Sequence, residues 1–354
     1  MKAPLRAAVA LLPGLALTLA LLARPAASSV MALARECAPF DAELAAHLGA
    51  LGVGDEPSGL VLRGRQALIF GAGPSIVKFV GREHTEQKEA ALQRPFVESC
   101  RREVDFFAAL EGAGREDGAR CAALAGLFPR VSLALCTPVS SSPADEAFAL
   151  VMDDLSAQGF VQPPSLSEQA AASALDSLAA LHAHYWGDAA VLAGDRGGFW
   201  PLERRPSHEL DEHAAQARWA AVAAAFSSEC RGLPQHLGRD LALAAQRLDA
   251  AVASTAVTMI HGDAKPANLF SRPDGDGDGG ACKLIDMQWC GRGNPLSDVA
   301  YLLATSLDAD LLQLAPAEGG GVEGTVDEDD AAAEAVFARL FASYSSSLLS
   351  RLGV

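Results

Sequence analysis

The spacing of apolar residues changes along the chain and divides it into two parts. In the first part, short apolar runs separated by glycine-rich turns are typical of strands. Two stretches with apolar residues at helical spacing interrupt them. We predict strands over Leu60–Leu62, Ala67–Phe70, Ser75–Val80 and Phe148–Met152, and helices over Asp41–Leu51 and Arg94–Leu110.

In the second part, apolar residues recur mainly every three or four positions, which predicts helices. Ser165 followed by Glu168 predicts a capping box at the start of the first of them. We expect this helix to end near Trp186 and residues 187–207 to form a loop. The other predicted helices are Glu209–Phe226, Leu237–Ala253, Leu296–Leu314 and Ala331–Leu352, and two strand-like runs are Val257–Ile260 and Cys282–Ile285.

The change falls near residues 152–154, so the sequence predicts an α+β fold with two lobes. Residues 37–152 would form a small, β-rich N-lobe, and residues 153–354 a larger, mainly helical C-lobe. Ligands favour the cleft between two such lobes.

Residues 1–36 differ from the rest of the chain. Lys2 and Arg6 precede an apolar run over residues 7–23, and small residues follow it. This order is typical of a signal peptide, although a membrane anchor or an organelle transit segment fits as well, and an apolar extension without a targeting role is the alternative. We therefore expect a targeting segment or a membrane tether, with a cytoplasmic location otherwise, and exclude residues 1–36 from the fold.

Composition narrows the class of protein. The 354 residues carry a formal net charge of −16, and half of them are hydrophobic. This excludes a disordered chain and a collagen, and the acidity argues against a nucleic-acid partner, which would need a basic face. The seven cysteines form no C-x-x-C pair, so neither a zinc site nor a disulfide framework is indicated.

Polar side chains with a common chemistry follow the two strand-like runs of the second part. Asp263 and Asn268 stand five residues apart after the first run, and Asp286 follows the second. Phosphoryl transfer needs a carboxylate that deprotonates the attacking hydroxyl, and oxygen ligands for the metal ions that neutralise the phosphates. Lys78 on a strand and Glu103 on the next helix could supply the ion pair that places an ammonium on those phosphates.

These residues resemble a known family. His261-Gly262-Asp263 with Asn268, followed by Ile285-Asp286, is similar to the kinase-like phosphotransferases of small molecules: aminoglycoside phosphotransferases, choline kinases and the ecdysteroid-kinase-like group, which resembles this chain most. Asp286-Met287-Gln288 resembles the I-D-x-Q segment of the last group, and Gly293–Leu303, with Asp298, resembles the element that follows it. The resemblance runs from about residue 40 to the end, and it implies a bilobal protein-kinase-like fold.

The resemblance also implies roles for the matching positions. Asp263 would be the catalytic base and Lys265 would steady the γ-phosphate, while Asn268 and Asp286 would bind Mg²⁺. Lys78, supported by Glu103, would contact the phosphates of ATP, and His261 and Asp298 would hold the catalytic loop. The main chain of Met152, Asp153, Asp154 and Leu155 would hydrogen-bond adenine.

Three features depart from the family pattern or invite another interpretation. No glycine-rich phosphate loop stands between Gly64 and Gly73, and Asp286 follows Asn268 by eighteen residues. The Asp/Gly run over residues 274–279 suggests a calcium loop, but Ile285 stands where that loop needs a glutamate, so a solvated hairpin is predicted instead. The acidic residues 323–330 predict a second solvated loop.

We expect a monomeric, ATP-dependent kinase that phosphorylates a hydroxyl group of a small molecule. The alternatives are a choline-, ethanolamine- or aminoglycoside-type kinase and, in another class, a non-catalytic nucleotide-binding pseudokinase. The intact Asp263, Asn268 and Asp286 argue against the pseudokinase. Four aromatic residues of the C-lobe could shape the substrate pocket or belong to the core: Trp186, Phe199, Trp200 and Trp219.

Overall fold

The computed structural model divides the chain into two units, which we describe separately. The described residues are 29–54, 61–116, 124, 126–198, 201–202, 211–228, 230–272, 282–312 and 326–354. The sheet unit consists of two segments: the described residues up to Val161, and Lys283–Trp289. The helical unit includes Gln162–Cys282 and Cys290–Val354.

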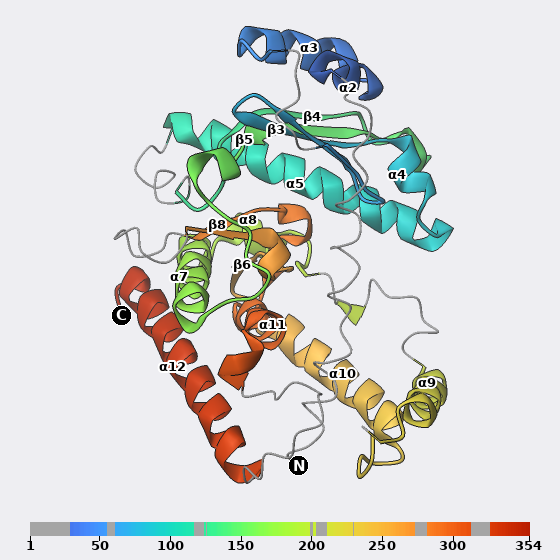
Figure 1. Cartoon of the computed structure of the whole chain (residues 1–354), viewed down its shortest axis with the longest axis vertical. Helices are drawn as coiled ribbons and strands as arrows, with labels where there is room; N and C mark the ends of the chain where they lie inside the picture. Colours follow the sequence, from blue (N-terminus) through green and yellow to red (C-terminus); the bar gives the residue numbers. More distant parts are fainter. Residues whose placement is uncertain are drawn as a thin grey trace. The chain divides into compact units, whose positions relative to one another are not determined.

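Five antiparallel strands form the centre of the sheet unit (Figure 1). Their order across the sheet is β1-β2-β3-β5-β4. The strands are β1 (Val61–Arg63), β2 (Leu68–Ala72), β3 (Ser75–Val80), β4 (Val131–Cys136) and β5 (Phe148–Asp153). Because β3 lies at the centre, between β2 and β5, its main chain is paired on both sides.

The two faces of the sheet carry different helices. Helices α2 (Val30–Glu36) and α3 (Asp41–Ala50) pack on one face and α5 (Ala90–Glu116) on the other (Figure 1). Val77 and Phe79 are buried in the core that α2 and α3 share with the sheet. Successive side chains of a strand point to opposite faces, so Lys78 lies on the α5 face. The strand pattern thus brings one lysine to the helix that carries Glu103.

Helix α2 corrects the exclusion of residues 1–36 from the fold. Ser29 caps this helix by accepting the Ala32 N–H at 3.1 Å, and Val30, Leu33 and Ala34 are fully buried in the core shared with the sheet. The helix formed by the last seven residues of the predicted targeting segment therefore contributes three residues to the core. The predicted apolar run over residues 7–23 lies outside the described residues. Within the described ranges, the structure contains no helix with the length and apolar character needed to cross a membrane.

Two further differences from the predicted elements lie in the sheet unit. Helix α5 begins at Ala90 rather than Arg94 and contains Pro95 in its second turn. A proline there removes only one N–H from the helix, and the buried residues that follow hold the helix in place. The sequence pattern also missed the short helix α4 (Arg82–Glu86) and two 3-10 turns, η2 (Pro143–Asp145) and η3 (Ser156–Gln158).

The helical unit is built around helix α7 (Glu168–His184), and α12 (Val326–Leu352) lies alongside it (Figure 1). Strands β6 (Thr258–Ile260) and β9 (Gly291–Gly293) pair antiparallel and frame the segment that carries Asp263. The remaining elements are α8 (Ala189–Ala193), α9 (Glu212–Ala225), α10 (Leu237–Ser254), η6 (Pro266–Asn268), β7 (Leu269–Ser271), α11 (Leu296–Ser306) and η8 (Ala309–Leu312). Strand β8 (Cys282–Leu284) begins one residue before the segment Lys283–Trp289, which belongs to the sheet unit. The 3-10 turn η7 (Met287–Trp289) ends that segment.

The predicted capping box at Ser165 is wrong. Ser167 is the N-cap and accepts the Ala170 N–H at 3.2 Å, whereas the Ser165 hydroxyl bonds Asp308. Glu168 turns outward to Arg339, with 2.7 Å from Arg339 Nε to Glu168 Oε1. Each of the two side chains of the predicted capping box therefore binds a residue far along the chain: Ser165 binds Asp308, and Glu168 binds Arg339.

Helix α11 stops at Ser306, well before the predicted end at Leu314. Leu307 adopts an extended conformation and forms a bridge with Leu166, which ends the helical hydrogen bonding. Helix α12 begins at Val326, so residues 326–330 are helical although the sequence predicts a loop there. The Asp/Gly run over residues 274–279 lies outside the described residues.

Candidate active site

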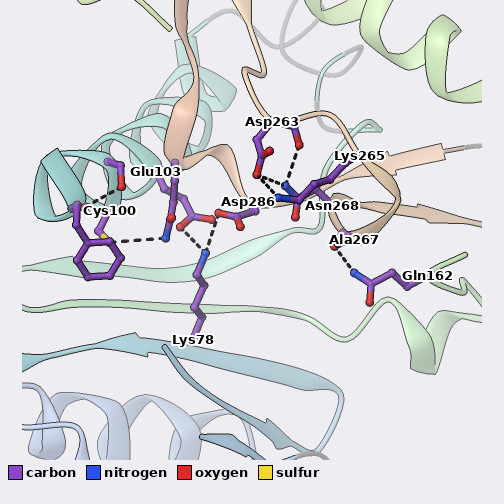
Figure 2. Close-up of polar contacts among 12 residues, drawn as sticks. Lys78, Cys100, Glu103, Gln162, Asp263, Lys265, Ala267, Asn268 and Asp286 are labelled. Atoms are coloured by element: carbon purple, nitrogen blue, oxygen red, sulfur yellow. Dashed lines mark hydrogen bonds and ion pairs between the residues drawn. The ribbon is translucent and has the colours of Figure 1, made fainter. Parts of the chain in front are cut away.

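Three charged side chains of the sheet unit form what we call the lysine cluster: Lys78, Glu103 and Asp286. Lys78 Nζ lies 2.7 Å from Glu103 Oε2 and 3.2 Å from Asp286 Oδ1, so the ammonium bridges two carboxylates (Figure 2). Only 3% of the Glu103 side chain is exposed, against 32% for Asp286. The buried carboxylate therefore holds the lysine, and the more exposed one is open to water.

The charge of this cluster follows from its composition. Burial alone would lower the pKa of Lys78, but the carboxylates of Asp286 and Glu103 raise that pKa above its ordinary value, so the lysine stays protonated. When both carboxyl groups are ionised, one ammonium and two carboxylates leave the cluster with a net charge of about −1. A cluster of this kind suits a bound cation.

Asp286 has a backbone conformation that few residues adopt. Its φ is 63°, in the left-handed region, and it is the one non-glycine residue with positive φ among those described. Asp and Asn enter this region more readily than other side chains, because their short polar groups bond nearby main-chain atoms. The turn after β8 therefore accepts an aspartate whose carboxylate is directed back to Lys78.

Gln288 contacts the lysine cluster through Glu103, and the sequence did not reveal this contact. It hydrogen-bonds the Glu103 carboxylate, and its Nε2 lies 3.6 Å from the Sγ atom of Cys100. Cys100 is buried, and burial raises the pKa of its thiol above the ordinary value, so it is an uncharged neighbour. The segment from Asp286 to Gln288 thus contacts both Lys78 and Glu103.

The segment predicted to bind adenine closes the end of β5. The N–H groups of Asp153 and Asp154 donate to the carbonyls of Arg130 and Pro74, each at 2.9 Å. The Asp154 side chain accepts the Ser156 N–H at 2.9 Å, and the side chain of Leu155 is buried. Two main-chain donors of the segment are therefore used within the fold, and its predicted role in binding adenine stays a prediction.

The loop over residues 261–268 of the helical unit, which the sequence predicts to be the catalytic loop, is held by a buried aspartate of α11. Asp298 Oδ2 accepts the His261 N–H at 2.7 Å, and Asp298 Oδ1 accepts the Gly262 N–H at 2.8 Å. Burial alone would raise the pKa of Asp298, but the hydrogen bond from His182 and the charge-stabilising N–H groups hold it below its ordinary value. Gly262 has φ 84°, so the glycine of the His-Gly-Asp motif fills a position where a side chain would be strained.

Asp263 projects from this loop with two partners. Lys265 Nζ lies 2.8 Å and Asn268 Nδ2 lies 3.0 Å from Asp263 Oδ2 (Figure 2). Asn268 Nδ2 also donates to the Asp263 carbonyl at 2.9 Å, which closes the loop on itself. The Asp263 carboxylate is therefore fixed in orientation by the same asparagine that the sequence singled out.

The structure brings the predicted residues together in two groups, one in each unit. Lys78, Glu103 and Asp286 form the lysine cluster, and the catalytic loop contains His261, Asp263, Lys265 and Asn268, held by Asp298. The sequence missed His182, which is fully buried on α7 and lies 3.1 Å from Asp298. Its helical spacing marks it as a packing residue, and no local pattern reveals its partner.

Asn268 and Asp286 each carry an oxygen atom of the kind that Mg²⁺ prefers. Asn268 directs its nitrogen at Asp263, so its amide oxygen is the atom with ligand chemistry, and Asp286 supplies a carboxylate. Mg²⁺ prefers oxygen ligands and takes only one or two carboxylates from a protein. No group of three or more His, Cys, Asp or Glu side chains suited to a metal occurs among the described residues.

Aromatic residues of the predicted substrate pocket are only partly described. Trp186 is 41% exposed at the end of α7, and Trp219 lies half-buried on α9. Phe199 and Trp200 lie outside the described residues. The pocket therefore stays a prediction.

Comparison with known proteins identifies one family. Residues 76–334, well over half of the chain, match the family model described as the phosphotransferase enzyme family, APH. The match begins in β3, two residues before Lys78, and includes every residue of the lysine cluster and of the loop over residues 261–268. No significant match was found among curated proteins.

The chain is also similar to solved structures at low sequence identity. An aminopropanol kinase associated with a microcompartment is 14% identical, with 86% of this chain and 99% of that chain covered and a TM-score of 0.36. The choline kinase LicA from Streptococcus pneumoniae is 14% identical, with 89% and 96% covered and a TM-score of 0.37. An aminoglycoside-3′-phosphotransferase of type VIII is 17% identical, with 83% and 90% covered and a TM-score of 0.33.

The family match and the described elements agree with the fold class that the sequence predicts. A small antiparallel sheet with a long helix forms one unit, and helices with short strands form the other. The α+β, protein-kinase-like fold is thus confirmed.

Proposed function

The chain belongs to the phosphotransferase enzyme family and is a small-molecule phosphotransferase, and from this premise we propose that it transfers the γ-phosphate of ATP to a hydroxyl group, with Asp263 as the general base. The observation that supports this most is the fixed carboxylate of Asp263, held by Lys265 and Asn268 in a loop that Asp298 anchors. A base must be oriented before it can take a proton from an acceptor hydroxyl. The contacts of Asp263 with Lys265 and Asn268 restrict its carboxylate in the way that this role requires.

The other residues take roles that follow from their contacts. Lys78, held by Glu103, binds the phosphates of the nucleotide through its ammonium group. Lys265 lies within hydrogen-bond distance of Asp263 and is 37% exposed, so it can balance charge on the transferred phosphoryl group. Asn268 and Asp286 would hold Mg²⁺, which supplies positive charge to the phosphate oxygens when it is bound.

Substitution of the base tests this proposal. We expect Asp263→Asn to lower kcat by about 10²–10⁴-fold, because a general base is lost while the loop keeps its hydrogen bonds. Asp286→Asn keeps a residue that tolerates the left-handed region and removes one carboxylate charge, so it should also abolish turnover without unfolding the chain. The measurement is ATP consumption with choline, ethanolamine, aminoglycosides, sterols and sugars as acceptors.

Two matched controls separate charge loss in general from loss at the site. Asp240→Asn changes an exposed carboxylate of the helical unit, and Asp105→Asn changes one of the sheet unit. Both should keep wild-type turnover. Near wild-type turnover by Asp263→Asn would contradict the role of Asp263. Metal-dependent ATP binding by the wild type without turnover on any acceptor would favour the pseudokinase alternative.

A further inference from the structure

The buried residue His182 connects the terminal helix of the chain to the catalytic loop. Its Nε2 atom lies 3.1 Å from Asp298 Oδ2, and its Nδ1 atom lies 2.8 Å from the hydroxyl of Tyr344 on α12. His182 and Tyr344 are 0% and 2% exposed, so water cannot replace either contact. The three side chains form a continuous path from α12 to the aspartate that holds the loop.

The chemistry of Asp298 fixes the direction of one of these hydrogen bonds, and the direction of the other follows for a neutral imidazole. Asp298 is an acceptor, and it already accepts N–H groups from His261 and Gly262, so His182 must donate to it from Nε2. In the neutral imidazole, Nδ1 is then the acceptor, and Tyr344 donates its hydroxyl proton to it. Burial and the nearby Asp298 raise the pKa of Tyr344 above its ordinary value, which keeps that proton on the hydroxyl.

We propose that Tyr344 is a positioning residue that acts through His182 and Asp298 on the main chain of His261 and Gly262. This inference rests on the proposed role of Asp263, which follows Gly262 directly. The hydroxyl of Tyr344 holds the His182 ring in the tautomer that donates to Asp298, and Asp298 then holds two consecutive N–H groups of the loop. A change at Tyr344 would therefore alter the hydrogen bonding of Gly262, the residue directly before Asp263.

A second contact of His182 supports the same connection. Its carbonyl accepts the Thr258 hydroxyl at 2.6 Å, and Thr258 begins β6, the strand that leads into the catalytic loop. His182 therefore holds the loop both through Asp298 and through the strand before it. Tyr344 is the partner of His182 that comes from α12.

The hydroxyl of Tyr344 can be removed with little change in packing. Its ring contacts the His182 ring edge to face, with centroids 5.9 Å apart, and phenylalanine preserves that contact. Ser345→Ala is the matched control, because it removes a hydroxyl from the next residue of α12 that bonds only the carbonyl of Phe341 in the same helix. A general weakening of α12 would affect both variants.

Hydrogen exchange of the full chain tests the connection without any substrate. In Tyr344→Phe, we expect the amides of His261 and Gly262 to exchange about fivefold faster, the effect of losing one hydrogen bond that holds their acceptor. Exchange in β3 and β5 should not change, and Ser345→Ala should match the wild type throughout. Equal exchange of His261 and Gly262 in Tyr344→Phe and the wild type would overturn the proposal.

Kinetics and a conservative variant provide the second readout. We expect Tyr344→Phe to lower kcat about fivefold with an unchanged KM for ATP, since the loop and not the nucleotide contacts is altered. His182→Gln keeps a donor for Asp298 and should retain more turnover than His182→Leu, which has a similar size but no donor. Equal turnover of the last two variants would contradict an action through Asp298.

The two readouts separate this inference from the proposed function. If the wild type phosphorylates no acceptor, the proposed function fails, while the exchange of His261 and Gly262 still decides whether Tyr344 positions the loop. If the wild type is active and Tyr344→Phe exchanges and turns over as the wild type does, only the inference fails.

Discussion

At the scale of single residues, the lysine cluster is a set of charges that depend on one another. Glu103 is almost fully buried, and the Lys78 ammonium is its counter-ion at 2.7 Å. A buried carboxylate without a counter-ion is costly, whereas removing both members of a pair costs much less. The stability of the sheet unit should therefore depend on whether the pair is broken or removed.

Replacing Lys78 by methionine tests this dependence. We expect Lys78→Met to lower the free energy of unfolding by about 3–5 kcal/mol, because it leaves the Glu103 carboxylate buried and unpaired. Adding Glu103→Gln to the same chain should recover a large part of that loss. Urea unfolding of both single variants and of the double variant gives the coupling between the two sites, and simple addition of the two losses would contradict it.

Single residues also show which part of the site the sequence could predict. Asp263, Asn268 and Asp286 stand in short local motifs, so their chemistry is visible in the sequence. His182 is different, because its partners Asp298 and Tyr344 lie 116 and 162 residues further along the chain. Only the fold brings such residues together. The apolar helical pattern around His182 does not indicate which residues the histidine contacts.

At the scale of elements, a buried carboxylate fastens α5 to the connection between β4 and β5. Glu146 Oε1 lies 2.6 Å from Arg94 Nη1, and Glu146 Oε2 lies 2.8 Å from Arg101 Nη2. The Ser140 N–H donates to the same carboxylate at 3.2 Å. Since Glu103 also lies on α5, this clamp helps to fix the helix that holds Lys78.

The clamp predicts a pH dependence of stability. Burial alone would raise the pKa of Glu146, but the hydrogen bonds from Arg101 and Arg94 lower it below the value of 4.5 expected in the unfolded chain. The unfolded state then binds the proton more readily, so the stabilisation is present above that value and is lost as the pH falls through the folded pKa. Between about pH 6 and about pH 3.5, the wild type should lose more unfolding free energy than Glu146→Gln. Equal losses in a series of denaturant titrations would contradict this role of Glu146.

The bounds of an element were predicted well where its contacts in the fold agree with the spacing of its apolar residues. The strand over Ser75–Val80 has the bounds that its apolar run predicts, because the sheet pairs every residue of it. Helix α11 ends early at Leu307 because a bridge to Leu166 competes with the helix, and Ser167 caps α7 because Asp308 takes Ser165. Element ends depend on distant partners, which the spacing of apolar residues does not contain.

At the scale of the whole molecule, α2 is part of the core of the sheet unit. Leu33 is fully buried with Phe70 and Val77 of the sheet. We expect Leu33→Ala to lower the free energy of unfolding by about 2–5 kcal/mol, the usual effect of a cavity in a packed core. Thermal or urea unfolding of the full chain provides the measurement.

Leu51 supplies the control for this prediction. It follows α3 directly and is 44% exposed, so Leu51→Ala should change the free energy of unfolding by about 0.5 kcal/mol or less. If Leu33→Ala were as stable as Leu51→Ala, α2 would contribute nothing to the core. Protein lacking residues 1–36 should lose this core contact as well, which makes it unsuitable for activity measurements.

The sheet unit is not continuous in sequence, and this affects how the protein can be divided into fragments or recombined with relatives. The sheet unit includes Lys283–Trp289 from far along the sequence, and Leu284 donates its N–H to the Leu127 carbonyl at 2.7 Å. A fragment ending at Val161 would carry Lys78 and Glu103 but not Asp286 or Gln288. Exchanging the sheet units of two relatives at a single crossover point would therefore combine two charges from one parent with the third from the other. A chimaera that keeps the cluster intact needs a second, seven-residue graft at positions 283–289.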